Sequence, residues 1–156
     1  GQEQGRRAGT ENVAALVGLG EACALAQARL QDMAKVSVLR ARLEAGLQTL
    51  GAVIFGQYAP RVANTSYFAF AHLQGETLQL ALNQAGFAVG TGAACSSQSA
   101  TPSPSLLAMG VDADLARAAI RVSLGTQHCV EDIDAFLSAV REVVTRLRGL
   151  AALSAT

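Results

Sequence analysis

The chain has 156 residues and carries 12 basic and 12 acidic side chains, so its formal net charge at pH 7 is zero. This length fits one domain with a single core, and the apolar fraction of 51% excludes a disordered chain or one that coats nucleic acid by bulk charge. The uncharged stretch 77–111 is broken by polar residues, glycine and proline, and no basic-then-apolar leader opens the chain, so we expect no membrane span, no membrane partner and no signal peptide.

The first fifty residues predict two helical stretches with a bend between them. Gly5–Gly9 predicts an irregular start, and Thr10 is a candidate N-cap for a helix that begins near Glu11. A second helix is indicated by an apolar stripe at helical spacing: Val36, Leu39, Leu43, Leu47 and Leu50.

The middle of the chain alternates between short strands and helices. Apolar runs at 52–55 and 65–70 predict two strands. Gly75-Glu76 opens a helix that ends at Gly86, and residues 87–89 predict a third strand.

Residues 90–103 are almost wholly glycine, alanine, serine and threonine, which predicts a loop. Ser103 is the expected N-cap, and Pro104 the first residue, of a short helix that runs to Met109 and is closed by Gly110. Alternation over 118–124 predicts a strand with Arg121 on its polar face.

The last helix has the clearest pattern, with apolar residues at helical spacing from Ile133 to Leu147. Acidic residues fall in its first turn, and we place Arg146 and Arg148 in its last turn, followed by a frayed tail at 151–156. The order of elements predicts an α/β fold in which helices cover a small mixed, partly antiparallel sheet.

Cys95 stands among the smallest side chains of the chain, in the 90–103 loop. One interpretation is a reactive thiol on a mobile tether, which could reach a substrate and then a second site. The other is an ordinary flexible loop that holds a cysteine.

Two further positions are candidates for binding. The planar fork of Arg121 suits a carboxylate, although a salt bridge to a neighbouring acid is an equally simple role. Thr10, with Arg7 nearby at a helix start, is a weaker candidate for holding a phosphate group.

The remaining cysteines and the histidines carry less information. Cys23 and Cys129 fit core or cap positions. Three cysteines without a CxxC spacing predict reduced thiols in the cytoplasm and no metal site. His72 and His128 fall in expected surface turns, and a Cys-His hydrolase that pairs one of them with Cys95 stays open.

Several segments, taken together and in order, resemble the C-terminal part of the NifS/IscS-type cysteine desulfurases of aminotransferase class V. They are 2–13, 90–97, 102–103 and 120–125, with shorter matches at 64–65, 75–76 and 131–134. The resemblance implies the C-terminal small domain of the pyridoxal-phosphate-dependent transferase fold. It also implies a homodimer that takes sulfur from L-cysteine and passes it to an acceptor or iron–sulfur scaffold protein.

The same resemblance implies roles for three residues. Cys95 becomes the catalytic nucleophile that carries the persulfide, Arg121 binds the substrate carboxylate, and Thr10 binds the phosphate of pyridoxal phosphate, in the partner subunit's site. Residues 1–50 become a helical segment that joins the small domain to a large domain outside this chain. Residues 51–150 form the small domain, with the cysteine loop at 90–103.

The chain departs from the family in one important respect. Its only lysine, Lys35, matches no Schiff-base lysine motif, so the cofactor lysine is expected outside this chain. Three alternatives therefore stay open: a catalytically silent fragment that retains dimerisation or scaffold-binding surfaces, a related selenocysteine lyase or aminotransferase, and the hydrolase mentioned above.

Overall fold

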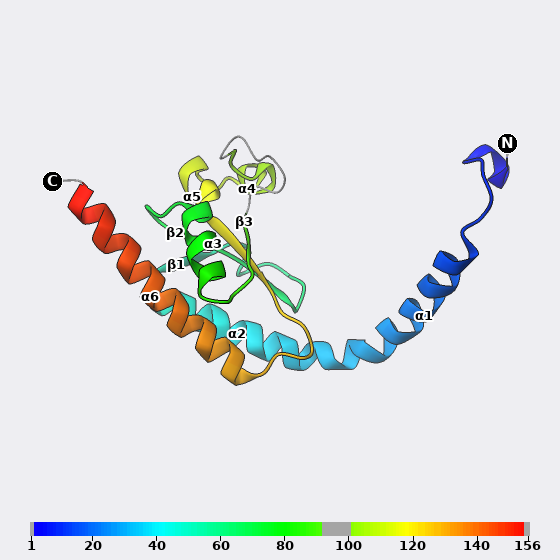
Figure 1. The fold of residues 1–156 in the computed structure, drawn as a ribbon, viewed down its shortest axis with the longest axis horizontal. Helices are drawn as coiled ribbons and strands as arrows, with labels where there is room; N and C mark the ends of the chain where they lie inside the picture. The colour runs from blue at the N-terminus through cyan, green and yellow to red at the C-terminus, as the bar shows by residue number, and fades with distance from the viewer. Residues whose placement is uncertain (1, 92–100, 155–156) are drawn as a thin grey trace. The chain divides into compact units, whose positions relative to one another are not determined.

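The computed structural model describes residues 2–91 and 101–154 (Figure 1). The chain divides into two compact units between Met33 and Ala34. The division falls earlier than the boundary expected at residue 50, because the second helix buries its apolar stripe in the core of the second unit.

The first unit is helical. It contains the 3-10 turns η1 (Glu3–Gly5) and η2 (Leu30–Asp32) and, between them, the helix α1 (Val13–Arg29). The N-cap is Asn12, whose Oδ1 accepts the backbone N–H of Ala15 at 3.1 Å. The expected cap at Thr10 is therefore wrong, because Thr10 lies two residues before Asn12 and the cap must stand directly before the first turn.

Helix α1 exposes its apolar side chains within its unit, and Cys23 is exposed as well, not in a core as expected. In the described part of the chain, the helical stretch Val13–Thr49 is long and apolar enough to cross a membrane by length and composition alone. This stretch lies outside the uncharged segment 77–111 on which the expectation of no membrane span rested. That no membrane partner exists stays a prediction.

The second unit is built on a four-stranded sheet in the order β1-β2-β4-β3. Its strands are β1 (Ala52–Ile54), β2 (Thr65–Phe70), β3 (Gly90–Thr91) and β4 (Ala119–Ser123). All three neighbouring pairs are antiparallel, so the expected mixture of directions is not found among the described strands. The α/β class itself is confirmed.

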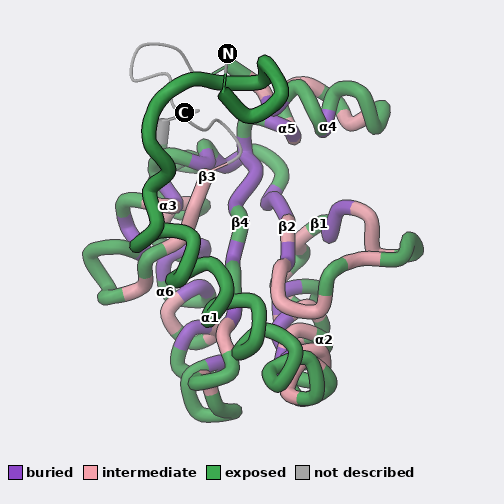
Figure 2. Tube along the Cα trace, turned by 90° about the vertical axis from the view of Figure 1, so that its right-hand side faces the viewer, coloured by how far each residue is buried: buried purple, intermediate pink, exposed green. Residues whose placement is uncertain are grey.

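One face of the sheet forms the main core with the long helices α2 (Met33–Thr49), α3 (Gly75–Gln84) and α6 (Val130–Ser154). Because side chains alternate along a strand, Phe68 and Phe70 of β2 share this face with Ile120 of β4, and all three are fully buried. Figure 2 shows the buried segments concentrated in β2 and β4 and on the inner sides of these helices.

The opposite face is only partly covered. Two short helices, α4 (Pro104–Ala108) and α5 (Ala113–Arg117), pack over Ala69 and Ala119. The cap of α4 is confirmed, since the Ser103 hydroxyl accepts the N–H of Leu106. Helix α5 was not predicted; its sequence signal is Asp112, whose carboxylate caps its first turn.

Two expectations about chain segments need correction. Residues 87–89 are not a strand, because the carbonyl of Val89 accepts a bond from the side chain of Gln79 and the N–H of Phe87 bonds to Leu82, so strand pairing starts only at Gly90. Helix α6 continues to Ser154, into the segment expected to fray, so Arg146 and Arg148 do not lie in its last turn.

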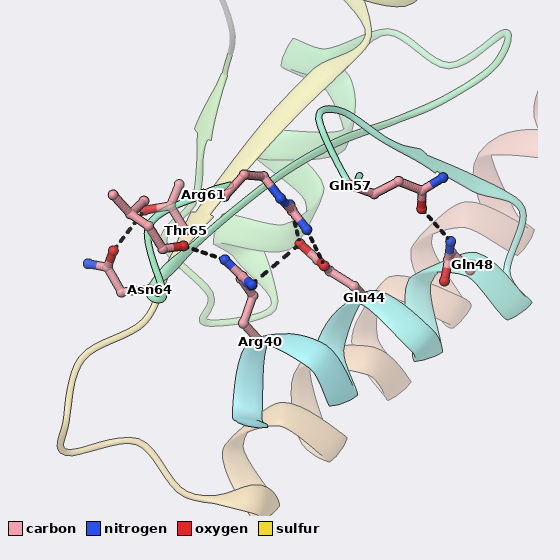
Figure 3. A network of polar contacts seen from close by, with 8 residues as sticks. Arg40, Glu44, Gln48, Gln57, Arg61, Asn64 and Thr65 are labelled. Carbon is pink, nitrogen blue, oxygen red and sulfur yellow. Dashed lines mark hydrogen bonds and ion pairs between the residues drawn. The ribbon is translucent and has the colours of Figure 1, made fainter. Parts of the chain in front are cut away.

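A network of charged side chains ties the 56–64 loop to α2 (Figure 3). Both nitrogens at the tip of Arg61 donate to Glu44, at 2.8 and 2.9 Å. Arg40 donates to the carbonyl of Val62, and its Nε lies 4.0 Å from Glu44. The loop that leads into β2 is therefore held by two arginines that share one carboxylate.

Candidate functional site

Arg121 lies in the middle of β4, on the partly covered face of the sheet, and is exposed. Its register partners are Tyr67 on β2 and Gly90 on β3. The guanidinium lies beside Gly90: a Cβ added there would be 3.6 Å from Nη2 and 3.7 Å from Nε of Arg121. The missing side chain of Gly90 therefore leaves the guanidinium accessible.

On its other side, Arg121 has Tyr67 as its register partner, and Tyr67 belongs to an aromatic pair. The ring of Tyr67 packs edge-to-face against buried Phe55, with ring centroids 5.4 Å apart. Directly opposed residues of an antiparallel pair hold their Cβ atoms about 5 Å apart, so Tyr67 limits the side-chain conformations of Arg121. The sequence alternation places Tyr67 on this face, but only the register shows it to be the neighbour of Arg121.

Within residues 2–91 and 101–154, the side chain of Arg121 forms no ion pair and no hydrogen bond, while its backbone takes part in the sheet. The salt-bridge interpretation of this arginine thus finds no support in the described part of the chain. A guanidinium that is exposed and flanked on both sides can accept a bidentate anion such as a carboxylate.

Of the three expected site residues, the structure describes Arg121 and Thr10, each within its own unit. Cys95 lies outside the described residues, although the segment that carries it starts at Gly90, opposite Arg121. Thr10 lies in the first unit, exposed and outside any helix. Beside it, Arg7 donates to the carbonyl of Gly9 at 3.0 Å and lies 3.6 Å from Glu11, so this arginine is already engaged.

Cys129 stands directly before the first residue of α6. Its backbone N–H donates to the carboxylate of Asp132 at 2.9 Å, and its Sγ lies 3.3 Å from the same oxygen. Hydrogen bonds to Glu131 and then to Asp132 raise the pKa of this thiol, which keeps it protonated and poorly nucleophilic. The expected cap role of Cys129 agrees with these contacts.

The remaining polar candidates lie elsewhere. His72 is an exposed turn residue with a φ of 64°, and Nδ1 of His128 accepts the N–H of Gly125 at 2.8 Å. Lys35 is exposed on α2. Among the described residues, no cluster of three or more histidine, cysteine or acidic side chains could hold a metal ion.

The fold is that of the small domain of pyridoxal-phosphate-dependent transferases. A solved structure named NIFS-like protein matches with a TM-score of 0.80 and 35% identity, over 94% of this chain and 37% of that one. A NifS-like protein from Rickettsia africae ESF-5 matches with a TM-score of 0.79 and 29% identity, over 92% of this chain and 38% of the other.

The chain belongs to the aminotransferase class-V family, which matches residues 1–136. A cysteine desulfurase of Bradyrhizobium diazoefficiens is 45% identical over 149 residues, which are 94% of this chain and 38% of that protein. Cysteine desulfurase IscS of Methanosarcina thermophila is 40% identical over 98% of this chain and 38% of its own length. The resemblance drawn from the motifs is thereby confirmed.

The chain spans about 38% of the length of these relatives. The apolar helical stretch Val13–Thr49 lies inside the family match. This stretch, with its exposed apolar side chains, is therefore part of the sequence that the family model covers, and not an insertion.

Proposed function

We propose that the chain is the C-terminal portion of a cysteine desulfurase that converts L-cysteine to L-alanine. In this proposal the sulfur becomes a persulfide on Cys95 and passes to an acceptor protein for iron–sulfur cluster or thio-cofactor assembly. The names of the relatives support the activity. The observation that carries the assignment to this chain is Arg121, an accessible guanidinium at the sheet position from which the cysteine segment starts.

Pyridoxal phosphate needs a group that holds its phosphate and a lysine for its aldehyde. The hydroxyl of Thr10, in an exposed non-helical segment, fits the first requirement. The second is not met by Lys35, the only lysine, which lies exposed on α2 away from the motifs of the family. The residues of this chain therefore fit the phosphate end of the cofactor, and the lysine must come from outside residues 1–156.

Arg121 orients the substrate. Two parallel N–H bonds to the substrate carboxylate fix its position and direction, while Tyr67 restricts the arginine from the side and Gly90 leaves its tip open. The bound cofactor supplies an electron sink for the amino-bearing carbon of the substrate.

Cys95 acts on the substrate sulfur. Its thiolate forms an S–S bond with that sulfur as the carbon–sulfur bond breaks, the electron pair of the broken bond stays with the amino-acid skeleton, and this skeleton takes up a proton and leaves as alanine. Cys95 stands four residues after Thr91, and four extended residues span about 14 Å. This short connection keeps the thiol within reach of a substrate held at Arg121.

We also propose a cellular location and an assembly. Reduced thiols and persulfide transfer suit the cytoplasm, and Thr10 completes a phosphate site in the partner subunit of a homodimer. The absence of a suitable lysine also favours a second candidate, a fragment that retains only association surfaces.

The test uses a complete enzyme that contains residues 1–156. Cys95→Ser abolishes sulfide release from L-cysteine, because a hydroxyl is far less nucleophilic toward sulfur and cannot hold a persulfide. Cys23→Ser and Cys129→Ser serve as matched controls and retain release. Mass spectrometry locates the added sulfur atom, and its presence on Cys23 or Cys129, or normal release by Cys95→Ser, would contradict the proposal.

A second experiment uses the chain alone and tests whether the catalytic lysine lies outside it. After the chain is incubated with pyridoxal phosphate and reduced with borohydride, we do not expect a phosphopyridoxyl group on Lys35 together with formation of alanine from L-cysteine. Coupled labelling of Lys35 would show that the catalytic lysine belongs to this chain.

A further inference from the structure

A row of four positions crosses the sheet on its partly covered face. Tyr67 of β2 is the register partner of Arg121 on β4, and Arg121 is the partner of Gly90 on β3. Phe55, directly after β1, continues the row, because its N–H donates to the carbonyl of Tyr67 at 2.8 Å. The strands that carry these positions lie side by side (Figure 2). Side chains in such a row stand on the same face of the sheet, so Phe55, Tyr67 and Arg121 are neighbours.

Tyr67 and Arg121 form the closer of the two kinds of antiparallel pair. The carbonyl of Tyr67 is directed to β1, where it accepts the bond from Phe55, so Tyr67 and Arg121 are a non-hydrogen-bonded pair. In such a pair the Cα atoms lie about 4.5 Å apart, against about 5.5 Å in a hydrogen-bonded pair. The ring of Tyr67 therefore stands directly beside the Arg121 side chain, on the β2 side.

The ring of Tyr67 is itself held in place. It packs edge-to-face on the ring of Phe55, with centroids 5.4 Å apart and planes at 70°. Phe55 is 6% exposed and belongs to the cluster that α4 and α5 form with the sheet, where it lies with Leu106 and Ala116. Tyr67 packs against the same cluster. Two short helices therefore fix Phe55, and Phe55 supports the ring of Tyr67.

The Arg121 side chain lies on the other side of its strand, toward Gly90. A Cβ added at Gly90 would be 3.6 Å from Nη2 and 3.7 Å from Nε of this arginine. Since no ion pair or hydrogen bond within the described residues holds the side chain, its direction depends on packing. A free arginine side chain visits many rotamers and loses that freedom when it binds a ligand. A wall on the β2 side removes the rotamers that point there and reduces this loss.

We propose that Tyr67, supported by Phe55, is a positioning residue: its ring keeps Arg121 turned toward Gly90, in the direction in which the guanidinium binds the substrate carboxylate. The proposal rests on the proposed function, since it takes Arg121 as the ligand of that carboxylate. The ring of Tyr67, and not its hydroxyl, has this effect. Tyr67 acts through Arg121 and needs no contact with the substrate.

The test uses the complete enzyme that contains residues 1–156. Tyr67→Ala should raise the Michaelis constant of L-cysteine and the inhibition constant of the product L-alanine about tenfold. The turnover number should be retained, because the carboxylate is held equally before and during the reaction. Tyr67→Phe keeps the ring and should leave both constants unchanged. In an Arg121→Ala background, Tyr67→Ala should change kcat/KM less than about twofold, because no guanidinium is left to position.

Two control variants separate positioning from the loss of a side chain or of packing. Tyr58→Ala removes a tyrosine of the 56–64 loop that is 95% exposed. Val111→Ala removes an apolar side chain that packs against the same cluster but does not belong to the row. Both variants should leave the Michaelis constant and the inhibition constant unchanged.

A second measurement reports the direction of Arg121 without substrate or activity. In NMR spectra of the 156-residue chain, the Nε–H of Arg121 should show a nuclear Overhauser effect to Gly90. This cross-peak should persist in Tyr67→Phe and be lost in Tyr67→Ala. The Arg121 Nε should also be less mobile on the ps–ns timescale than the Nε of exposed Arg141 on α6. If Tyr67→Ala does not fold, this wild-type mobility decides.

Three results would contradict the positioning role and leave the proposed function standing. The first is a Tyr67→Ala enzyme with unchanged constants while Arg121→Ala raises them. The second is a Tyr67→Phe or Val111→Ala enzyme as impaired as Tyr67→Ala. The third is an Arg121 side chain as mobile as that of Arg141. Unchanged constants in Arg121→Ala would instead contradict the proposed carboxylate site, and the positioning role would fail with it.

Discussion

Replacement of Glu44 by glutamine tests how the 56–64 loop is held on α2. The side chains of Glu44 and Arg61 are only 12% and 17% exposed, and two short bonds join them. Burial works against the ionisation of Glu44, but the bonds and charge of Arg61, with the charge of Arg40, outweigh it and lower the pKa of Glu44. Glu44→Gln keeps the shape and removes the charge.

The expected loss of stability follows from this burial. The variant replaces two charge-assisted hydrogen bonds by at most one neutral bond and leaves Arg40 and Arg61 without a counter-charge. Breaking a buried ion pair from one side costs about 3 to 5 kcal/mol, and a hydrogen bond to a charged group about 1.5 to 3 kcal/mol. Since these side chains keep some solvent contact, we expect about 2 to 4 kcal/mol.

Urea unfolding followed by far-UV circular dichroism measures this difference. With a slope near 2 kcal/mol per molar urea, the midpoint should fall by about 1 to 2 M at pH 7. Because the pKa of Glu44 is lowered in the folded chain, its contribution is complete above the unfolded pKa and is lost as pH falls through the folded value. The gap between wild type and variant should therefore close in acid.

The matched control is Glu142→Gln on the exposed surface of α6, which should change the midpoint little. Equal midpoints for wild type and Glu44→Gln at pH 7 would show that Arg61 does not hold the loop through Glu44. A gap that widens as pH falls below the unfolded pKa would contradict the lowered pKa.

Three further predictions concern single positions. Gly75→Ala should destabilise the chain by about 1 to 3 kcal/mol, because the added Cβ would lie 2.7 Å from the carbonyl oxygen of Arg117. Gly149→Ala, whose Cβ would meet nothing within 4 Å, should not destabilise it, and thermal unfolding of both variants measures the difference. Ser103→Ala should cost about 1 kcal/mol in the same assay, and an unchanged midpoint would remove the cap of α4. In a complete enzyme, Arg121→Lys should weaken the apparent binding free energy of L-cysteine by about 1.5 to 3 kcal/mol, with cofactor binding retained. If the Michaelis constant and the inhibition constant of a substrate analogue are both unchanged, Arg121 does not belong to the site.

The sequence by itself determined the elements whose signals are local. The apolar stripe of α6, the Ser103-Pro104 start of α4 and the alternation around Arg121 each depend on residues a few positions apart. The ordered motifs also indicated the family, since they combine residue identity with spacing. Asp112 was an equally local signal for α5, and a cap search would have found that helix.

Only the tertiary structure decided what depends on partners distant in the sequence. Whether residues 87–89 form a strand depended on Gln79, whose side chain binds the carbonyl that strand pairing needs. The neighbours of Arg121 depended on register, which places Tyr67 on one side and Gly90 on the other. The physical reason is that hydrogen-bonding groups take whichever partner the packed chain brings within reach, and local pattern fixes the face of a residue but not the residue across from it.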